Sequence, residues 1–128
     1  MTVRIVRLGS ARAPNEGLRI GTVRRPPRGV PKSQYSRQNW YDVWVPELAP
    51  SAELLKKMKP NKTQRDWALF KRSYRAEMEA PDKGRLLNLL AALSQAANFS
   101  VGCYCAEESR CHRSVLRALL KERGARLE

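Results

Sequence analysis

One short apolar run between two helical patterns restricts the possible folds of this chain more than any other feature. Residues 98–105 are short and apolar enough to form a buried strand, with Phe99, Val101 and Cys103 on one side. Leucines precede this run at helical spacing, and a second helical pattern follows it. A buried strand between two helices is typical of an α/β fold.

Two further strands are predicted near the N-terminus. Residues 3–8 and 18–23 alternate apolar with other residues, as strands do. The alternation changes phase between Ile5 and Val6, which predicts either a β-bulge or two partly buried faces. Residues 24–32 contain three prolines, so they form neither a helix nor a central strand and are expected to be a basic loop.

The middle of the chain predicts an extended segment followed by helices. Residues 40–45 are aromatic and β-branched and suit a short strand. Ser51 begins a short helix that continues to about Met58, and Asp82 begins another. Between them Thr63 is a suitable N-cap for a helix with a core-facing stripe that consists of Trp67, Phe70, Tyr74 and Met78.

These elements define the expected architecture. The last helix has an apolar face within residues 115–120, and Gly124 is placed to end it. The order is then β, β, extended, α, α, α, β, α. It predicts a small single α/β domain, residues 1–128, in which helices pack on a mixed or parallel sheet.

Apolar stretches and cysteines indicate the cellular environment. The longest apolar stretch in the second half, residues 86–97, is too short and too polar for a membrane span, so no membrane partner is expected. The N-terminal residues mix apolar and cationic side chains, unlike a signal peptide. Three closely spaced cysteines suit thiol chemistry or metal binding better than a disulfide framework. We therefore expect a cytoplasmic protein.

The charge of the chain points to anionic partners. The formal net charge is +13 at pH 7, which attracts phosphates, nucleic acid or acidic partners over long range. Residues 105–113 join the predicted buried strand to the last helix, where open α/β sheets bind their ligands. Amides in the first turn of that helix favour a phosphate or carboxylate. This segment is the candidate site.

Our preferred hypothesis is a cationic pocket at one end of the sheet. Residues 24–28 and 105–113 would converge there and bind a phosphate-bearing ligand, either a nucleotide or nucleic acid. In this hypothesis Arg24, Arg28, Arg110 and Arg113 bind the charge, and Cys105, Cys111 and His112 line the pocket. The sequence leaves the oligomeric state open.

Enzymatic activity is a second hypothesis that the sequence leaves open. Cys105 or Cys111 would be a thiolate nucleophile, His112 an acid or base, and Arg110 would bind the oxyanion of the substrate. The layout is broadly that of thiol-dependent phosphatases and sulfurtransferases. Those phosphatases, however, place an arginine six positions after the cysteine, where this chain has Cys111.

Two other hypotheses concern metal and nucleic acid. Cys103, Cys105, Cys111 and His112 supply four possible metal ligands, although their spacing departs from paired C-x-x-C motifs and no particular cofactor follows. Cys103 could equally pack in the core as a small apolar residue. In a basic nucleic-acid-binding protein, the aromatic residues Trp40, Tyr41 and Trp44 would instead stack on bases.

Several segments resemble the domain of unknown function 488 (DUF488) family, and in particular its YeaO-like branch. These segments are residues 19–29, 44–51, 70–78 and 105–116, the last with its Cys-His-Arg-Ser-Val-Leu end. Val23 stands where the family usually has Asp, and Pro26 where it usually has Trp. The resemblance implies a small cytoplasmic bacterial or archaeal α/β domain, without an established activity, substrate or cofactor.

Overall fold

Four parallel strands form one sheet in the computed structural model, which describes residues 1–57 and 63–128. Their order is β1-β4-β2-β3. The strands are β1 Val3–Arg7, β2 Leu18–Gly21, β3 Val43–Trp44 and β4 Phe99–Cys103, and the α-helices are α1 Ala52–Lys57, α2 Gln64–Glu77, α3 Pro81–Leu93 and α4 His112–Glu122. The predicted α/β class is confirmed, and the sheet is parallel.

β4 is the central strand and is buried along its whole length. Phe99 and Val101 belong to the main core cluster, to which α2, α3 and α4 all contribute. Gly102 points to the other face, where a Cβ atom would lie 2.8 Å from the Val6 carbonyl oxygen of the neighbouring strand. The absence of a side chain at this position allows β1 to pair closely with β4. The strand predicted from residues 98–105 is therefore confirmed.

β1 shows how its irregular alternation is accommodated. Its residues pair one-to-one with β4, from Val3 opposite Phe99 to Arg7 opposite Cys103, without a bulge. The three central residues of β1 are all half-buried. Of the two explanations for the change of phase, partial burial of both faces is therefore correct.

Helix starts follow the predicted signals closely. The Thr63 hydroxyl accepts a hydrogen bond from the Asp66 amide at 3.0 Å, and the Asp66 carboxylate accepts one from the Thr63 amide at 3.3 Å. This capping box begins α2. The third helix begins at Pro81 and not at Asp82, because proline is favoured in the first turn, where its missing N–H costs no hydrogen bond.

The helices also end and pack as expected. Phe70, Tyr74 and Met78 are buried, whereas Trp67 at the start of the stripe is half-buried. Gly124, with a φ of +84°, follows the end of α4. Met58, the predicted end of the first helix, lies outside the described residues. No helix in the two described ranges is both long and apolar enough to cross a membrane.

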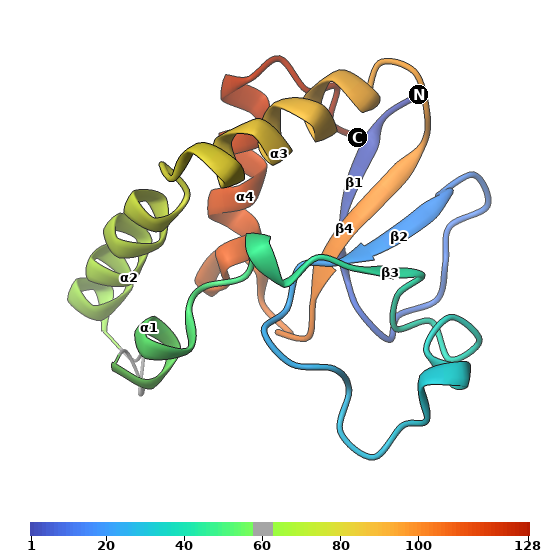
Figure 1. Ribbon diagram of the computed structural model, residues 1–128, viewed down its shortest axis with the longest axis horizontal. Coiled ribbons are helices and arrows are strands. Elements are labelled where there is room, and N and C mark those ends of the chain that lie inside the picture. The colour runs from blue at the N-terminus through green and yellow to red at the C-terminus, as the bar shows by residue number, and fades with distance from the viewer. Residues whose placement is uncertain (58–62) are drawn as a thin grey trace.

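Loops, and not helices, cover the second face of the sheet. Figure 1 shows the helices to one side of the sheet and residues 22–42 beyond the carboxyl ends of the strands. On the face away from the helices Arg19 is fully buried: it pairs with Glu16 at 2.7 Å and donates to the carbonyl oxygens of Ser10 and Asn39. The Ser100 hydroxyl on β4 donates to the same Glu16 carboxylate at 2.7 Å. A buried ion pair thus joins a loop, β2 and β4.

The Glu16 carboxylate is ionised at neutral pH. Burial by itself raises its pKa, but hydrogen bonds from Arg19, Ser100 and the Ala13 amide, together with the positive charge of Arg19, outweigh burial and lower the pKa to about 2. The carboxylate therefore compensates the charge of Arg19 throughout the neutral range.

Candidate functional site

A cavity of about 710 Å³ lies at the carboxyl ends of β1, β2 and β4. We call it the carboxyl-edge pocket. Its lining includes the residues Arg7, Arg25, Arg28, Trp40 and Tyr104, which come from the end of β1, the loop after β2, the segment before β3 and the end of β4. Parallel strands bring these ends to one edge, which is where open α/β sheets bind ligands.

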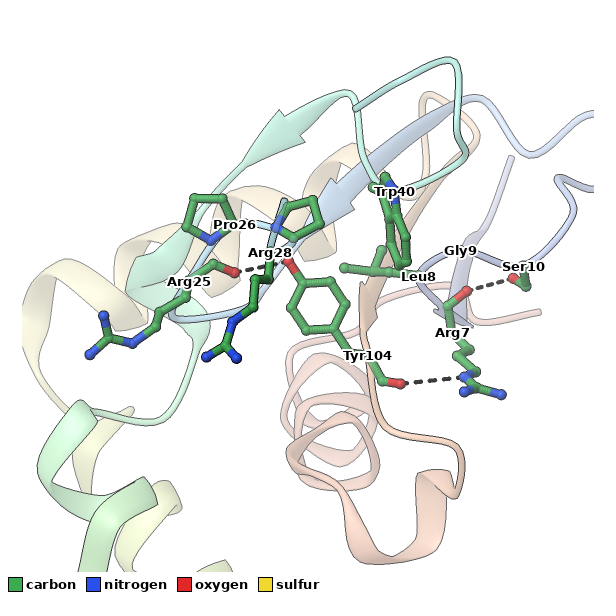
Figure 2. Close-up of a pocket in the computed structure, with 10 residues that line it drawn as sticks. Arg7, Leu8, Gly9, Ser10, Arg25, Pro26, Arg28, Trp40 and Tyr104 are labelled. Carbon is green, nitrogen blue, oxygen red and sulfur yellow. Dashed lines mark hydrogen bonds between the residues drawn. The ribbon is translucent and has the colours of Figure 1, made fainter. Parts of the chain in front are cut away.

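Tyr104 organises the pocket. Its hydroxyl donates to the Arg25 carbonyl oxygen at 2.9 Å, and its own carbonyl oxygen accepts from Nε of Arg7 at 3.3 Å. Its ring meets that of Trp40 edge-on, with centroids 5.9 Å apart. In Figure 2 the side chains of Arg7 and Arg28 lie on opposite sides of the Tyr104 ring, while the guanidinium of Arg25 points away from it. Two cations thus flank an aromatic wall.

The two arginines predicted in the early loop are placed differently. Arg28 is exposed and lines the carboxyl-edge pocket. Arg24 is half-buried and donates hydrogen bonds to the carbonyl oxygens of Pro50 at 3.1 Å and Ala49 at 3.2 Å. Arg24 therefore fixes the segment before α1 and is not among the residues that line the pocket.

The two arginines predicted near the last helix are also separated from the pocket lining. Arg110 is half-buried and donates to the Thr63 carbonyl oxygen at 3.2 Å. Arg113 is 3% exposed, and its Nη2 donates to the Cys105 carbonyl oxygen at 2.7 Å. Arg113 therefore lies beside the cysteines.

The three cysteines and the histidine come together at the start of α4. We call Cys103, Cys105, Cys111 and His112 the thiol–imidazole cluster. Sγ of Cys103 is 3.7 Å from Sγ of Cys105, and Sγ of Cys111 is 3.7 Å from Nδ1 of His112. Ligand atoms of Cys103, Cys111 and His112, all buried, lie within 4.8 Å of one another. Only Cys105 is exposed.

Hydrogen bonds among the thiols separate their acidities. The pKa of Cys105 is lowered to about 3. The largest cause is the hydrogen bond that the Cys103 thiol donates, and the hydrogen bond with Cys111 and the charge of Arg113 add to it and outweigh partial burial. The same bond to Cys105, together with burial, raises the pKa of Cys103. The cluster therefore loses its first proton from its exposed member.

The cluster and the pocket share walls. Cys103 and Cys111 belong to a second core cluster with Leu8, and the rings of Trp40 and Tyr104 pack against it. Leu8, Trp40 and Tyr104 also line the carboxyl-edge pocket. Cys103 and Cys111 thus pack in the same cluster as residues of the pocket wall, although the pocket lining itself includes neither a cysteine nor His112.

The aromatic residues of the nucleic-acid hypothesis divide between surface and core. Trp40 is half-buried and lines the pocket. Tyr41 is 3% exposed and packs in the second core cluster, so it cannot stack on a base. Trp44 is 41% exposed, outside the pocket lining, and its indole N–H donates to the Val23 carbonyl oxygen at 2.7 Å.

Sequence reasoning missed several residues of the pocket. Arg25 was not singled out, although it lies in the loop of residues 24–28 that was predicted to form the pocket. Arg7 and Tyr104 were not among the predicted site residues, although they stand at the carboxyl ends of two predicted strands. In a parallel sheet all such ends meet at one edge. The signal was therefore present for these two residues, and it required the assumption that the first and last strands are parallel.

The fold and the pocket define a small parallel α/β protein with a cationic, aromatic cavity at the carboxyl edge of its sheet. The chain belongs to the DUF488 family. A family model described as DUF488-N3a, active DUF488-N3 subclade, matches residues 3–124, which is nearly the whole chain. This match is consistent with the resemblance to the YeaO-like branch. Neither curated proteins nor solved structures gave a match.

Proposed function

We propose that this protein binds a nucleotide, either free or as the terminal unit of a nucleic-acid strand, in the carboxyl-edge pocket. The observation that carries the proposal is the convergence of Arg7, Arg28, Trp40 and Tyr104, from four separate segments, on one cavity. A nucleotide combines a phosphate with a flat aromatic base. The two kinds of side chain around the cavity match these two parts.

Phosphate recognition is supported by the charges around the cavity. Arg7 and Arg28 flank Tyr104, and both are exposed, so a ligand can reach them from solvent. Guanidinium groups donate paired hydrogen bonds that suit phosphate oxygens. Glu108, which could repel an anion near the last helix, forms an ion pair with Arg117 at 2.6 Å. The net charge of +13 adds long-range attraction.

Base recognition is supported by the two rings. Trp40 and Tyr104 meet edge-to-face, with an interplanar angle of 77°, so each ring keeps at least one face that the other ring does not cover. A base can stack on such a face with little dependence on its identity. The volume of about 710 Å³ is within the range of small-molecule sites.

The test is calorimetric titration of the whole protein with four probes: adenosine, ribose 5-phosphate, AMP and a 5′-phosphorylated single-stranded oligonucleotide. AMP is expected to bind more tightly than either fragment, because only AMP engages both the arginines and the rings. If the oligonucleotide binds more tightly than AMP, the ligand of the pocket is the end of a nucleic-acid strand. If the two bind with equal affinity, the ligand is a free nucleotide. Adenosine that binds as tightly as AMP, or no binding of any probe, would contradict the proposal.

Replacing one ring should separate base from phosphate recognition. Trp40→Leu is expected to weaken AMP binding about tenfold, because stacking on one aromatic ring stabilises a base by roughly 1–3 kcal/mol. Its affinity for ribose 5-phosphate should be unchanged. Trp44→Leu is the matched control, since Trp44 lies outside the pocket lining. The same loss of AMP affinity in both variants would exclude stacking on Trp40.

A further inference from the structure

The thiol–imidazole cluster contains two pairs of ligand atoms with the spacing of a tetrahedral metal site, and three of its four ligand atoms lie within 4.8 Å of one another. Zn–S bonds of roughly 2.3 Å place neighbouring sulfur ligands about 3.8 Å apart, and a Zn–N bond places sulfur and nitrogen about 3.6 Å apart. The Cys103 and Cys105 sulfurs are 3.7 Å apart, and Sγ of Cys111 is 3.7 Å from Nδ1 of His112. Two edges of the tetrahedron are therefore present.

The orientation of His112 leaves Nδ1 available as a ligand. Its Nε2 lies 2.8 Å from the Thr22 carbonyl oxygen, which can only accept a hydrogen bond. The Thr22 hydroxyl, 3.4 Å from the same nitrogen, donates its own proton to the Gly102 carbonyl oxygen. Nε2 therefore carries the ring proton and Nδ1 presents its lone pair towards Cys111. A histidine fixed by a backbone carbonyl in this way is typical of metal ligands.

A buried positive charge supports an anionic complex at the same place. Arg113 is 3% exposed, and the ion pairs of residues 1–57 and 63–128 include no carboxylate partner for it. Its Nε is buried and has no hydrogen-bond partner within the described ranges. A buried charge without a carboxylate partner is costly unless another anionic group lies near it. Zinc with three thiolates and one neutral imidazole carries a net charge of −1, which would compensate the guanidinium.

We propose that the thiol–imidazole cluster binds one Zn²⁺ through Sγ of Cys103, Cys105 and Cys111 and Nδ1 of His112. Binding releases the thiol protons, and four protein ligands close the coordination shell, as in structural zinc sites. Tyr104 stands between two of the ligands in the chain and forms a wall of the carboxyl-edge pocket. The metal would therefore fix that wall in place.

The test is titration of the reduced, metal-free protein with Co²⁺ in a buffer without chelators. One equivalent is expected to produce thiolate-to-cobalt charge-transfer absorption and the intense visible bands of tetrahedral cobalt, and one equivalent of Zn²⁺ should remove both. Zn²⁺ should also protect the exposed thiol of Cys105 from iodoacetamide. The absence of charge-transfer absorption, or alkylation at the same rate with and without Zn²⁺, would overturn the proposal.

Variants assign the ligands. Cys105→Ser, at the exposed position, and Cys111→Ser, at a buried one, should each weaken Co²⁺ binding by more than the roughly 10–100-fold that loss of a supporting second-layer contact costs. Tyr104→Phe is the control. The residue lies between Cys103 and Cys105, and the change removes only a hydroxyl group that is not one of the proposed ligands. Because the exposed variant should fold normally, unchanged cobalt spectra in Cys105→Ser would exclude the four-ligand site. Nucleotide binding by metal-free protein tests the proposed function separately.

Discussion

Replacement of Arg19 by methionine is expected to destabilise the protein by about 3–5 kcal/mol, which is the usual cost of removing one partner from a buried ion pair. The variant leaves the Glu16 carboxylate buried without its cation. It also removes the donor that Nη1 of Arg19 supplies to the carbonyl oxygens of Ser10, at 2.9 Å, and Asn39, at 2.8 Å. Urea unfolding followed by circular dichroism measures the difference.

The matched control is a surface ion pair. Arg75 pairs with Glu122 at 2.8 Å, with side chains 35% and 52% exposed. Arg75→Gln should therefore cost less than about 1 kcal/mol. Equal losses in the two variants would contradict the role of Arg19 in the fold. Arg19 holds the backbone of Ser10, which lines the pocket, and that of Asn39, which precedes the pocket residue Trp40. Arg19→Met should therefore also weaken AMP binding.

The double variant Arg7→Gln and Arg28→Gln is expected to lose about 100-fold in affinity for AMP. A hydrogen bond to a charged group contributes roughly 1.5–3 kcal/mol, and exposure to solvent reduces each contribution towards the roughly 1.4 kcal/mol that corresponds to a factor of ten. The two side chains lie on either side of Tyr104 and both line the pocket, so each is expected to contact the bound nucleotide from its own side. Calorimetric titration measures the change.

The control for this variant removes the same two charges elsewhere. Arg72 on α2 and Arg85 on α3 are exposed and are not part of the pocket lining. The variant with both changed to Gln should lose less than about threefold, because salt screens distant charges. Similar losses in both double variants would mean that net charge, and not the pocket, attracts the nucleotide.

The architecture could be predicted largely because its elements carry local signals. The apolar run of residues 98–105 identified the central strand, and the Thr63 capping box identified the start of α2. The strand order could not be predicted, since β4 inserts between β1 and β2 from a distant part of the chain. The role of Arg19 was also hidden, because a single charged residue in a strand is ordinarily expected to reach solvent.

The candidate site could be predicted only in part, for a related reason. The segment of residues 105–113 was recognised because it joins the predicted buried strand to the last helix, where open α/β sheets bind ligands, and its cysteines and histidine added chemistry to that position. The convergence of Arg28 with Arg7 and Tyr104 depends on strand order, which no local pattern encodes. Arginine is abundant in this chain, so residue type alone did not distinguish Arg28, which lines the pocket, from Arg24, which donates hydrogen bonds to backbone carbonyl oxygens.

The most direct test of nucleotide binding in the carboxyl-edge pocket is a titration of ¹⁵N-labelled protein with AMP, followed by NMR. The largest shifts are expected at the backbone amides of Gly9, Ser10, Arg28 and Tyr104 and at the indole N–H of Trp40, all of which belong to residues that line the pocket. Shifts that instead cluster around Lys121 and Ala125 in the second cavity, or no shifts at all, would contradict the account.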